Sequence, residues 1–314
     1  MAIQQPAELA AKEKKIRLLI AGPPGIGKTS LALSAPNPLL IDVDRGLDRV
    51  AAMYRKPFIQ PAKYEEILAD LTPVNMKGFD TLVFDTGGQL IKTMTPWAIR
   101  QNDKNGQRDG SLSLKGYGAV GREFERLMNH CYYELDKNIV VVFHSKEEKD
   151  SDNTRLRLHV EGQTKDNVYQ PMDLAGQMEI IGTNRVLSFS PSERYFAKGT
   201  HGITGSMTIP ELTAGMPNDF LTKLFDDVNG SIKAEAADVE VERRLYEDVM
   251  MGARDVVSEI NTPEQADEAV KYFKNLPHYL TSEREIRSMF AKRVKELGFK
   301  IDRKTGRYVV KEVA

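Results

Sequence analysis

The segment GPPGIGKT has the residue types and spacing of a loop that holds a phosphate chain. Glycines such as Gly22 and Gly27 let the backbone curl until successive N–H groups point at phosphate oxygens. Lys28 can reach the terminal phosphates, and the hydroxyl of Thr29 is an oxygen ligand suited to Mg²⁺. The residues expected to contact the nucleotide are Gly22, Pro23, Pro24, Gly25, Ile26, Gly27, Lys28, Thr29 and Ser30.

A phosphate loop also needs a carboxylate to hold the magnesium ion. The apolar run TLVFD ends in Asp85, and a charged group that ends a buried strand needs a compensating charge. Magnesium supplies that charge, so we expect Thr29 and Asp85 to hold Mg²⁺ together. The alternative is an aspartate that caps the next turn.

Two further acids and a histidine end other apolar runs. In LLIDVD, Asp42 and Asp44 share one face of a strand because side chains alternate, and either could orient the attacking water. We favour Asp44 because it ends the run, and leave Asp42 as the alternative. In IVVVFHS, His144 could detect the terminal phosphate or merely cap its strand. The predicted catalytic residues are therefore Lys28, Asp44 and His144. The chain has no Asn-Lys-x-Asp guanine signature, which favours ATP over GTP.

The elements that must position these residues alternate between strands and helices, which indicates an α/β fold with a mostly parallel sheet flanked by helices. The expected strands are 17–21, 39–44, 81–85 and 138–144, and the expected helices are 28–34, 63–71, 121–136 and 218–228. Short alternating runs over 155–210 predict an antiparallel extension of the sheet.

The chain divides by pattern into a tail (1–15), a core (16–228), a linker (229–240) and a helical C-terminal region (241–314). The periodic spacing of apolar residues stops at the linker. In the last region, Thr262, Pro263 and Gln265 have the pattern of a helix start, and a further helix opens at Ser282 and stops at Gly298.

Composition limits the class of protein. The chain has 314 residues and a formal net charge of -1, so any nucleic-acid site must be a local patch. No apolar run reaches the roughly 18 residues of a membrane span. The N-terminal residues lack a hydrophobic signal-peptide core. The single cysteine, Cys131, lies in a helical pattern and reads as a buried apolar residue, and we expect a cytoplasmic protein.

Four segments in order, GPPGIGKT, LLIDVDRGLD, TLVFDTGGQLIK and IVVVFHS, resemble the RecA-like P-loop NTPase core. They look most like the small phage-encoded ATPases of the Sak group, over residues 16–228. The resemblance implies ATP and Mg²⁺, a homo-oligomer, single-stranded DNA as substrate and a single-strand DNA-binding protein as a partner. Asp44 falls at the family's catalytic glutamate, one methylene shorter, which implies slow hydrolysis. His144 falls at the polar γ-phosphate sensor.

The segment RYFAKGTHG resembles the Lys-x-Arg-Phe-Gly motif, whose basic side chains reach a neighbouring subunit's nucleotide. Lys198 matches the lysine of that motif. Thr200 stands at the arginine position, so one half of the pair is missing.

Two polar segments fall where RecA-like proteins carry DNA-binding loops, 100–118 and 145–171. Cations would meet phosphates and a tyrosine would stack on bases. The expected DNA-binding residues are Arg100, Lys104, Arg108, Lys115 and Tyr117 in the first loop, and Lys146, Lys149 and Arg155 in the second. Acidic residues dilute both loops, and either could be an ordinary solvated connection.

Three functions are compatible with these patterns. The first is a RecA-like ATPase that acts on single-stranded DNA in phage recombination, strand annealing or repair. The second is a kinase for a nucleotide or another small molecule, which would need arginines around the acceptor. The third is a nucleotide-gated binding module with negligible turnover, which Asp44 in place of glutamate would favour.

Overall fold

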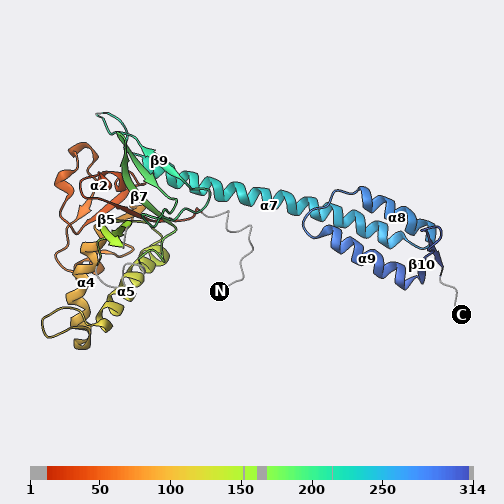
Figure 1. Ribbon diagram of the computed structural model, residues 1–314, viewed down its shortest axis with the longest axis horizontal. Helices are drawn as coiled ribbons and strands as arrows, with labels where there is room; N and C mark the ends of the chain where they lie inside the picture. Colours follow the sequence, from red (N-terminus) through yellow and green to blue (C-terminus); the bar gives the residue numbers. More distant parts are fainter. Residues whose placement is uncertain (1–12, 151–152, 161–167, 214, 311–314) are drawn as a thin grey trace. The chain divides into compact units, whose positions relative to one another are not determined.

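A computed structural model describes residues 13–150, 153–160, 168–213 and 215–310 (Figure 1). The chain divides into two compact units, Glu13–Ser231 and Ile232–Ala314. No helix in the described part of the chain is both long and apolar enough to cross a membrane.

The core of the first unit is a mostly parallel sheet. Its strands are β1 (Arg17–Gly22), β2 (Pro38–Asp42), β3 (Phe58–Ile59), β4 (Thr81–Asp85), β5 (Asn138–Asp150), β6 (Asn153–Leu158), β7 (Leu174–Ile181), β8 (Asn184–Ser188) and β9 (Ser206–Ile209). The order is β3-β2-β4-β5-β1-β7-β8-β9, and β6 pairs with β5 alone. Pairing is parallel from β3 to β7 and antiparallel for β8 and β9. The expected α/β class, with its antiparallel extension, is confirmed.

Helices cover both faces of this sheet. One face packs against α3 (Tyr64–Asp70), α4 (Gly87–Gln101) and α5 (Leu114–Asn129) in one large apolar cluster. Alternate residues of β1 point to the other face. That face carries the short α2 (Lys28–Ala32) and the first turns of α7 (Phe220–Glu259). A hydrogen bond connects the two: Leu221 N at the start of α7 donates to the hydroxyl of Ser34, which follows α2. Short 3-10 turns lie at Leu47–Arg49, Ala52–Tyr54 and Asp103–Asn105, and a π-helical turn at His130–Glu134.

Helix α4 and strand β7 were not anticipated from the sequence. The helix begins at Thr86, whose hydroxyl accepts a hydrogen bond from Gln89 N. Its buried stripe of Leu90, Ile91, Met94 and Ala98 has helical spacing. Two glycines in its first turn and an internal proline conceal that stripe in the sequence.

The two expected DNA-binding loops are largely regular structure, which corrects their description. Arg100 belongs to α4, and Lys115 and Tyr117 belong to α5, so the connection is only 102–113. In the second segment, β5 continues past His144 and forms an antiparallel hairpin with β6. Its residues 151–152 and 161–167 lie outside the described residues.

The second unit is helical, as expected, and ends in a small hairpin that was not expected. It contains the remainder of α7, α8 (Pro263–Asn275), α9 (Ser282–Glu296), β10 (Phe299–Ile301) and β11 (Tyr308–Val310). The predicted start of α8 is confirmed, because Thr262 and Gln265 form a reciprocal capping box. The helix α9 ends before Gly298, whose φ is 69°.

The boundary between the two units, Ser231/Ile232, lies inside the expected linker 229–240, but these residues continue the helix α7. The segment lacks an apolar stripe, yet it is rich in alanine and glutamate, which favour helix without a partner face. The expected tail lies outside the described residues up to position 12. Its remaining part is tied to the core, because Lys14 pairs with Asp173 at 2.9 Å.

Candidate functional site

The phosphate loop follows the carboxyl end of β1. Gly22 must be glycine, because a Cβ atom there would lie 2.9 Å from the carbonyl oxygen of Met178 on β7. Gly25 and Gly27 have φ values of 78° and 101°, a conformation that other residues adopt at a cost. The loop therefore has the curled backbone that the sequence predicts for a phosphate cradle.

Lys28 lies folded over this loop. Its ammonium group donates to the carbonyl oxygen of Pro23 at 2.7 Å, and the side chain is almost fully buried. Burial lowers the pKa of Lys28 to about 8, and the carboxylates of Asp85 and Asp44 oppose that shift. The helix α2 that follows is only five residues long, shorter than expected. The loop amides and Lys28, rather than a long helix dipole, are thus the donors for a phosphate.

The predicted magnesium ligands lie together. The Thr29 hydroxyl donates to Asp85 Oδ2 at 2.6 Å. Burial raises the pKa of Asp85 to about 6, while the hydrogen bond from Thr29 lowers it. No cluster of three or more histidine, cysteine or acidic residues among the described residues could hold a metal without other ligands. This donor set fits Mg²⁺, which prefers oxygen and completes its shell with water and phosphate.

The structure distinguishes Asp42 from Asp44. Asp42 is 1% exposed and accepts hydrogen bonds from Gly46 N (2.9 Å), Leu47 N (3.2 Å) and Gln60 Nε2 (2.8 Å). It therefore holds the following loop in place. The strand β2 ends at Asp42, so the expectation that the two acids share one strand face is wrong. Asp44 lies in the turn beyond the strand, where its carboxylate is 3.6 Å from the guanidinium of Arg49 and remains partly exposed.

His144 lies beside the loop on the neighbouring strand. It pairs in register with Gly22, and β5 separates β1 from β4, which ends at Asp85. Among the described atoms its Nδ1 has no hydrogen-bond partner although it is buried. Burial lowers the pKa of His144, and the nearby positive charge of Lys28 lowers it further. A neutral imidazole with an unsatisfied nitrogen is thus available to a ligand at the loop.

A cavity of about 340 Å³ adjoins the loop. Gly27, Ser30 and Tyr54 line it, and two arginines, Arg49 and Arg185, contribute positive charge. Sequence analysis missed Arg185, which comes from β8 and whose Nε lies 3.8 Å from the position of a Cβ atom on Gly27. No motif marks this arginine, because the antiparallel return of β8 alone brings it to the loop.

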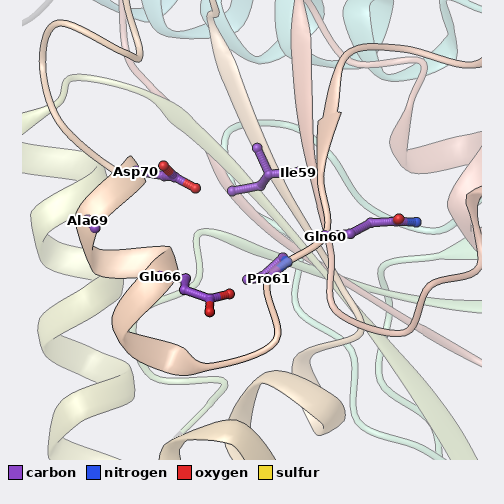
Figure 2. A pocket seen from close by; sticks show the side chains of 6 residues that line it. All are labelled: Ile59, Gln60, Pro61, Glu66, Ala69 and Asp70. Atoms are coloured by element: carbon purple, nitrogen blue, oxygen red, sulfur yellow. The ribbon is translucent and has the colours of Figure 1, made fainter.

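A second cavity, of about 270 Å³, lies between the end of β3 and α3 (Figure 2). Glu66 and Asp70 on α3 line it, and Gln60 points away toward its hydrogen bond with Asp42. Two carboxylates and no cation make this cavity unsuited to a triphosphate.

The remaining predicted residues lie apart from the loop. The ammonium of Lys198 donates to the carbonyl oxygen of Met172 at 2.6 Å, before the amino end of β7. Arg100 forms an ion pair with Glu65, and Lys146 one with Glu148 at 3.0 Å. Tyr117 is half-buried against the core cluster and so offers no free ring. Lys104, Arg108, Lys115 and Lys149 are exposed. Cys131 is buried, as expected, and burial raises its pKa.

The fold and this site together define an α/β core with a phosphate-binding loop at the carboxyl end of β1, as the sequence predicted. A family model described as AAA domain matches residues 14–201, more than half of the chain, so the chain belongs to the AAA domain family. None of the curated protein sequences matches it.

Three solved structures are similar to this chain. A KaiC-like protein of Pyrococcus horikoshii OT3 is 12% identical over 62% of this chain and 89% of that chain, with a TM-score of 0.33. An ATPase from the type III secretion system of pathogenic bacteria is 13% identical over 90% and 81%, with a TM-score of 0.38. The flagellar accessory protein FlaH of Methanocaldococcus jannaschii is 10% identical over 62% and 90%, with a TM-score of 0.31.

Proposed function

We propose that this protein hydrolyses ATP with Mg²⁺ and uses the nucleotide cycle to control its grip on single-stranded DNA. The setting is recombination, strand annealing or repair of the kind served by phage ATPases of the Sak group. The protein would act as a homo-oligomer in the cytoplasm, with a single-strand DNA-binding protein as a partner. The buried cysteine fits such a reducing compartment.

The observation that carries this proposal is the continuity of β5. The strand holds His144 level with the phosphate loop and then runs on, without a break, into the β5–β6 hairpin. The hairpin is closed at its base where His159 N donates to the carbonyl oxygen of His144 at 2.7 Å. A displacement of His144 by a terminal phosphate would therefore move the hairpin.

Cations on the hairpin could meet a phosphate backbone, although acidic residues of the same hairpin balance their charge. In its register, Lys146 lies opposite Arg157, and Glu148 lies opposite Arg155, so these four side chains share one face. Three of these four side chains are cations, and the acid Glu148 pairs with Lys146 at 3.0 Å. Lys149 is exposed on the other face. Electrostatic contacts of this kind bind the backbone of any sequence.

In the chemical step, each residue has a separate task. The loop amides and Lys28 would neutralise charge that develops on the phosphates. Thr29 and Asp85 would hold Mg²⁺, which supplies electrostatic stabilisation of the leaving phosphate. Asp44 would accept a proton from the attacking water and orient it. Because Arg49 pairs with Asp44, the base is restrained until that pair opens.

The pairing of Asp44 with Arg49 also favours a second candidate, a nucleotide-gated binding module with negligible turnover. In that case ATP binding alone would move the hairpin. A kinase is less well supported, because Arg100, an arginine that could surround an acceptor, is held by Glu65 on α3.

The test is ATP hydrolysis by the wild type and by Lys28→Ala, each with and without single-stranded DNA. We expect hydrolysis that depends on Lys28 and rises with DNA. A Lys146→Gln/Lys149→Gln/Arg157→Gln variant should keep basal turnover and lose stimulation. Its matched control is Lys56→Gln/Lys63→Gln/Lys77→Gln, which removes three exposed lysines elsewhere on the same unit.

Turnover that ignores DNA, together with no retention of DNA at low salt, would contradict the proposal. ATP-dependent DNA binding without measurable hydrolysis would identify the gated module. Consumption of ATP only in the presence of a small acceptor would identify a kinase.

A further inference from the structure

Positive charge is concentrated at the end of the second unit. The segment Lys292–Arg307 contains seven basic and two acidic residues, a formal charge of +5. The preceding part, Ile232–Ala291, contains eight basic and thirteen acidic residues, a formal charge of -5. Since the whole chain has a net charge of only -1, the positive segment is a local feature that the total conceals.

The turn between β10 and β11 is closed by its own hydrogen bonds. Asp302 N donates to the carbonyl oxygen of Arg307 at 2.8 Å, and Gly306 N donates to that of Asp302 at 2.8 Å. The carboxylate of Asp302 accepts from Lys304 N at 3.0 Å and from the Thr305 hydroxyl at 2.8 Å. One of the two acids is thus engaged in shaping the turn that presents the cations.

Six cations of this segment form what we call the basic surface, and all six are exposed. They are Lys292, Lys295, Lys300, Arg303, Lys304 and Arg307. Within the described part of the chain, no carboxylate lies within ion-pair distance of any of them. Arg293 differs, because its guanidinium donates to the carbonyl oxygen of Ile260 at 2.8 Å and holds the end of α7.

We propose that the basic surface binds the phosphate backbone of nucleic acid. Unpaired cations on an ordered turn lose little side-chain hydrogen bonding when they meet phosphates, and they release the counterions of the polymer. A two-stranded ribbon is also narrow enough to enter a groove of duplex DNA. Binding is expected on single strands and on duplex alike, and stronger on duplex because its charge density is higher.

The aromatic residues of the hairpin decide how the polymer is recognised. Phe299 and Tyr308 pack into the unit's own core, and the Tyr308 ring lies 5.6 Å from that of Phe290. No ring is therefore free to stack on bases, so recognition is of the backbone and independent of sequence. Ile301 and Val310 of the hairpin are exposed, so an anionic bilayer is the alternative ligand, and a vesicle assay separates it from nucleic acid.

This inference goes beyond the proposed function, because the basic surface contains no residue of the phosphate loop or of the β5–β6 hairpin. It is tested on the full-length protein without any nucleotide. A negative binding result for the basic surface would not affect the conclusion on ATP turnover and its stimulation by DNA. A negative ATPase result would likewise not affect the conclusion on binding by the basic surface.

The experiment measures binding of labelled single-stranded and duplex oligonucleotides by anisotropy over a series of salt concentrations. The variant is Arg303→Gln/Lys304→Gln/Arg307→Gln. For duplex, we expect the slope of log affinity against log salt to fall by about 2 to 3, since each phosphate contact contributes about 0.9. Affinity at low salt should fall at least about tenfold.

The matched control is Lys271→Gln/Lys274→Gln/Arg284→Gln, three exposed cations of the same unit with the same change in charge. It should leave the slope unchanged. An unchanged slope in the first variant, or an equal loss in the control, overturns the proposal. Binding to phosphatidylserine vesicles is measured in parallel. If the first variant loses vesicle binding while its DNA binding stays intact, the proposal is also overturned. If thermal unfolding shows that the first variant is destabilised, Lys292→Gln/Lys295→Gln on α9 must give the proportionate fall in slope instead.

Discussion

The phosphate loop and the basic surface both suit phosphate groups, yet they are built in opposite ways. The loop buries its lysine and holds its hydroxyl and carboxylate 2.6 Å apart. The basic surface places six cations in solvent with no fixed partner. The first arrangement fixes donors before the ligand arrives, whereas the second relies on charge density.

This difference teaches which property each region can have. Fixed donors in a buried site distinguish one terminal phosphate from another and are weakly screened by salt. Exposed cations act additively and are strongly screened, so they suit a long polymer with many equivalent phosphates. Single substitutions should therefore have large effects in the loop and small ones at the basic surface.

The largest effect is expected for Lys28→Ala. Removing the one cation of the loop should lower ATP turnover at least about 100-fold, or roughly 3 kcal/mol. Lys304→Ala at the basic surface should leave basal turnover unchanged. Steady-state phosphate release measures both, and a Lys28→Ala variant within a few-fold of the wild type would break the comparison.

The next effect concerns Asp85, whose pKa is raised from 3.8 to about 6 by burial. The folded state binds this proton more tightly than the unfolded state does, so the contribution to stability is complete below pH 3.8. It is lost as the pH rises through about 6, at a cost of up to about 3 kcal/mol.

We therefore expect Asp85→Asn to raise the melting temperature of the nucleotide-free protein at pH 8, with a difference that shrinks toward pH 4. The same variant should lose stabilisation by ATP with Mg²⁺. Thermal unfolding over a pH series measures both effects. A variant less stable than the wild type at pH 8 would mean that the Thr29 hydrogen bond outweighs burial.

A smaller effect separates the two acids near β2. Asp42→Ala should lower stability by about 2 kcal/mol, because three donors, one of them the buried Leu47 N, lose their acceptor. Asp44→Asn should change stability by less than about 0.5 kcal/mol and instead lower turnover. Chemical denaturation and ATP turnover are measured on both variants. A loss of stability in Asp44→Asn and a loss of turnover alone in Asp42→Ala would contradict these roles.

The smallest effect is expected in the turn of the basic surface. Gly306 has a φ of 71°, and a Cβ atom there would meet nothing within 4 Å. Gly306→Ala should therefore cost only backbone strain, about 1 kcal/mol, visible as faster hydrogen exchange of the hairpin amides. Gly230→Ala is the control, since it adds a methyl group in open space within α7 at ordinary φ and should stabilise.

Much of the core could be predicted because its signals are local. The four expected strands and the phosphate loop exist where apolar runs end at a glycine, an aspartate or a histidine. The helix α4 was hidden by its glycines and Pro96, and β7 by the absence of any distinctive end. The linker's place was predicted, but its helical conformation was not, because a solvated helix needs no apolar stripe.

The sequence by itself determined the phosphate loop and the approach of Thr29 to Asp85. The positive φ angles of the loop need only Gly25 and Gly27, which are local in the sequence. The sequence pattern also fixes where the loop ends at Thr29 and where the strand ends at Asp85.

Only the tertiary structure decided the rest of the site. It ended β2 at Asp42 rather than at Asp44, so that Asp42 holds the following loop and Asp44 lies in the turn beside Arg49. It also folded β8 back along β7 and brought Arg185 to the loop. The physical reason is that a side chain's neighbours depend on where strands stop and how they pair, which no local pattern encodes.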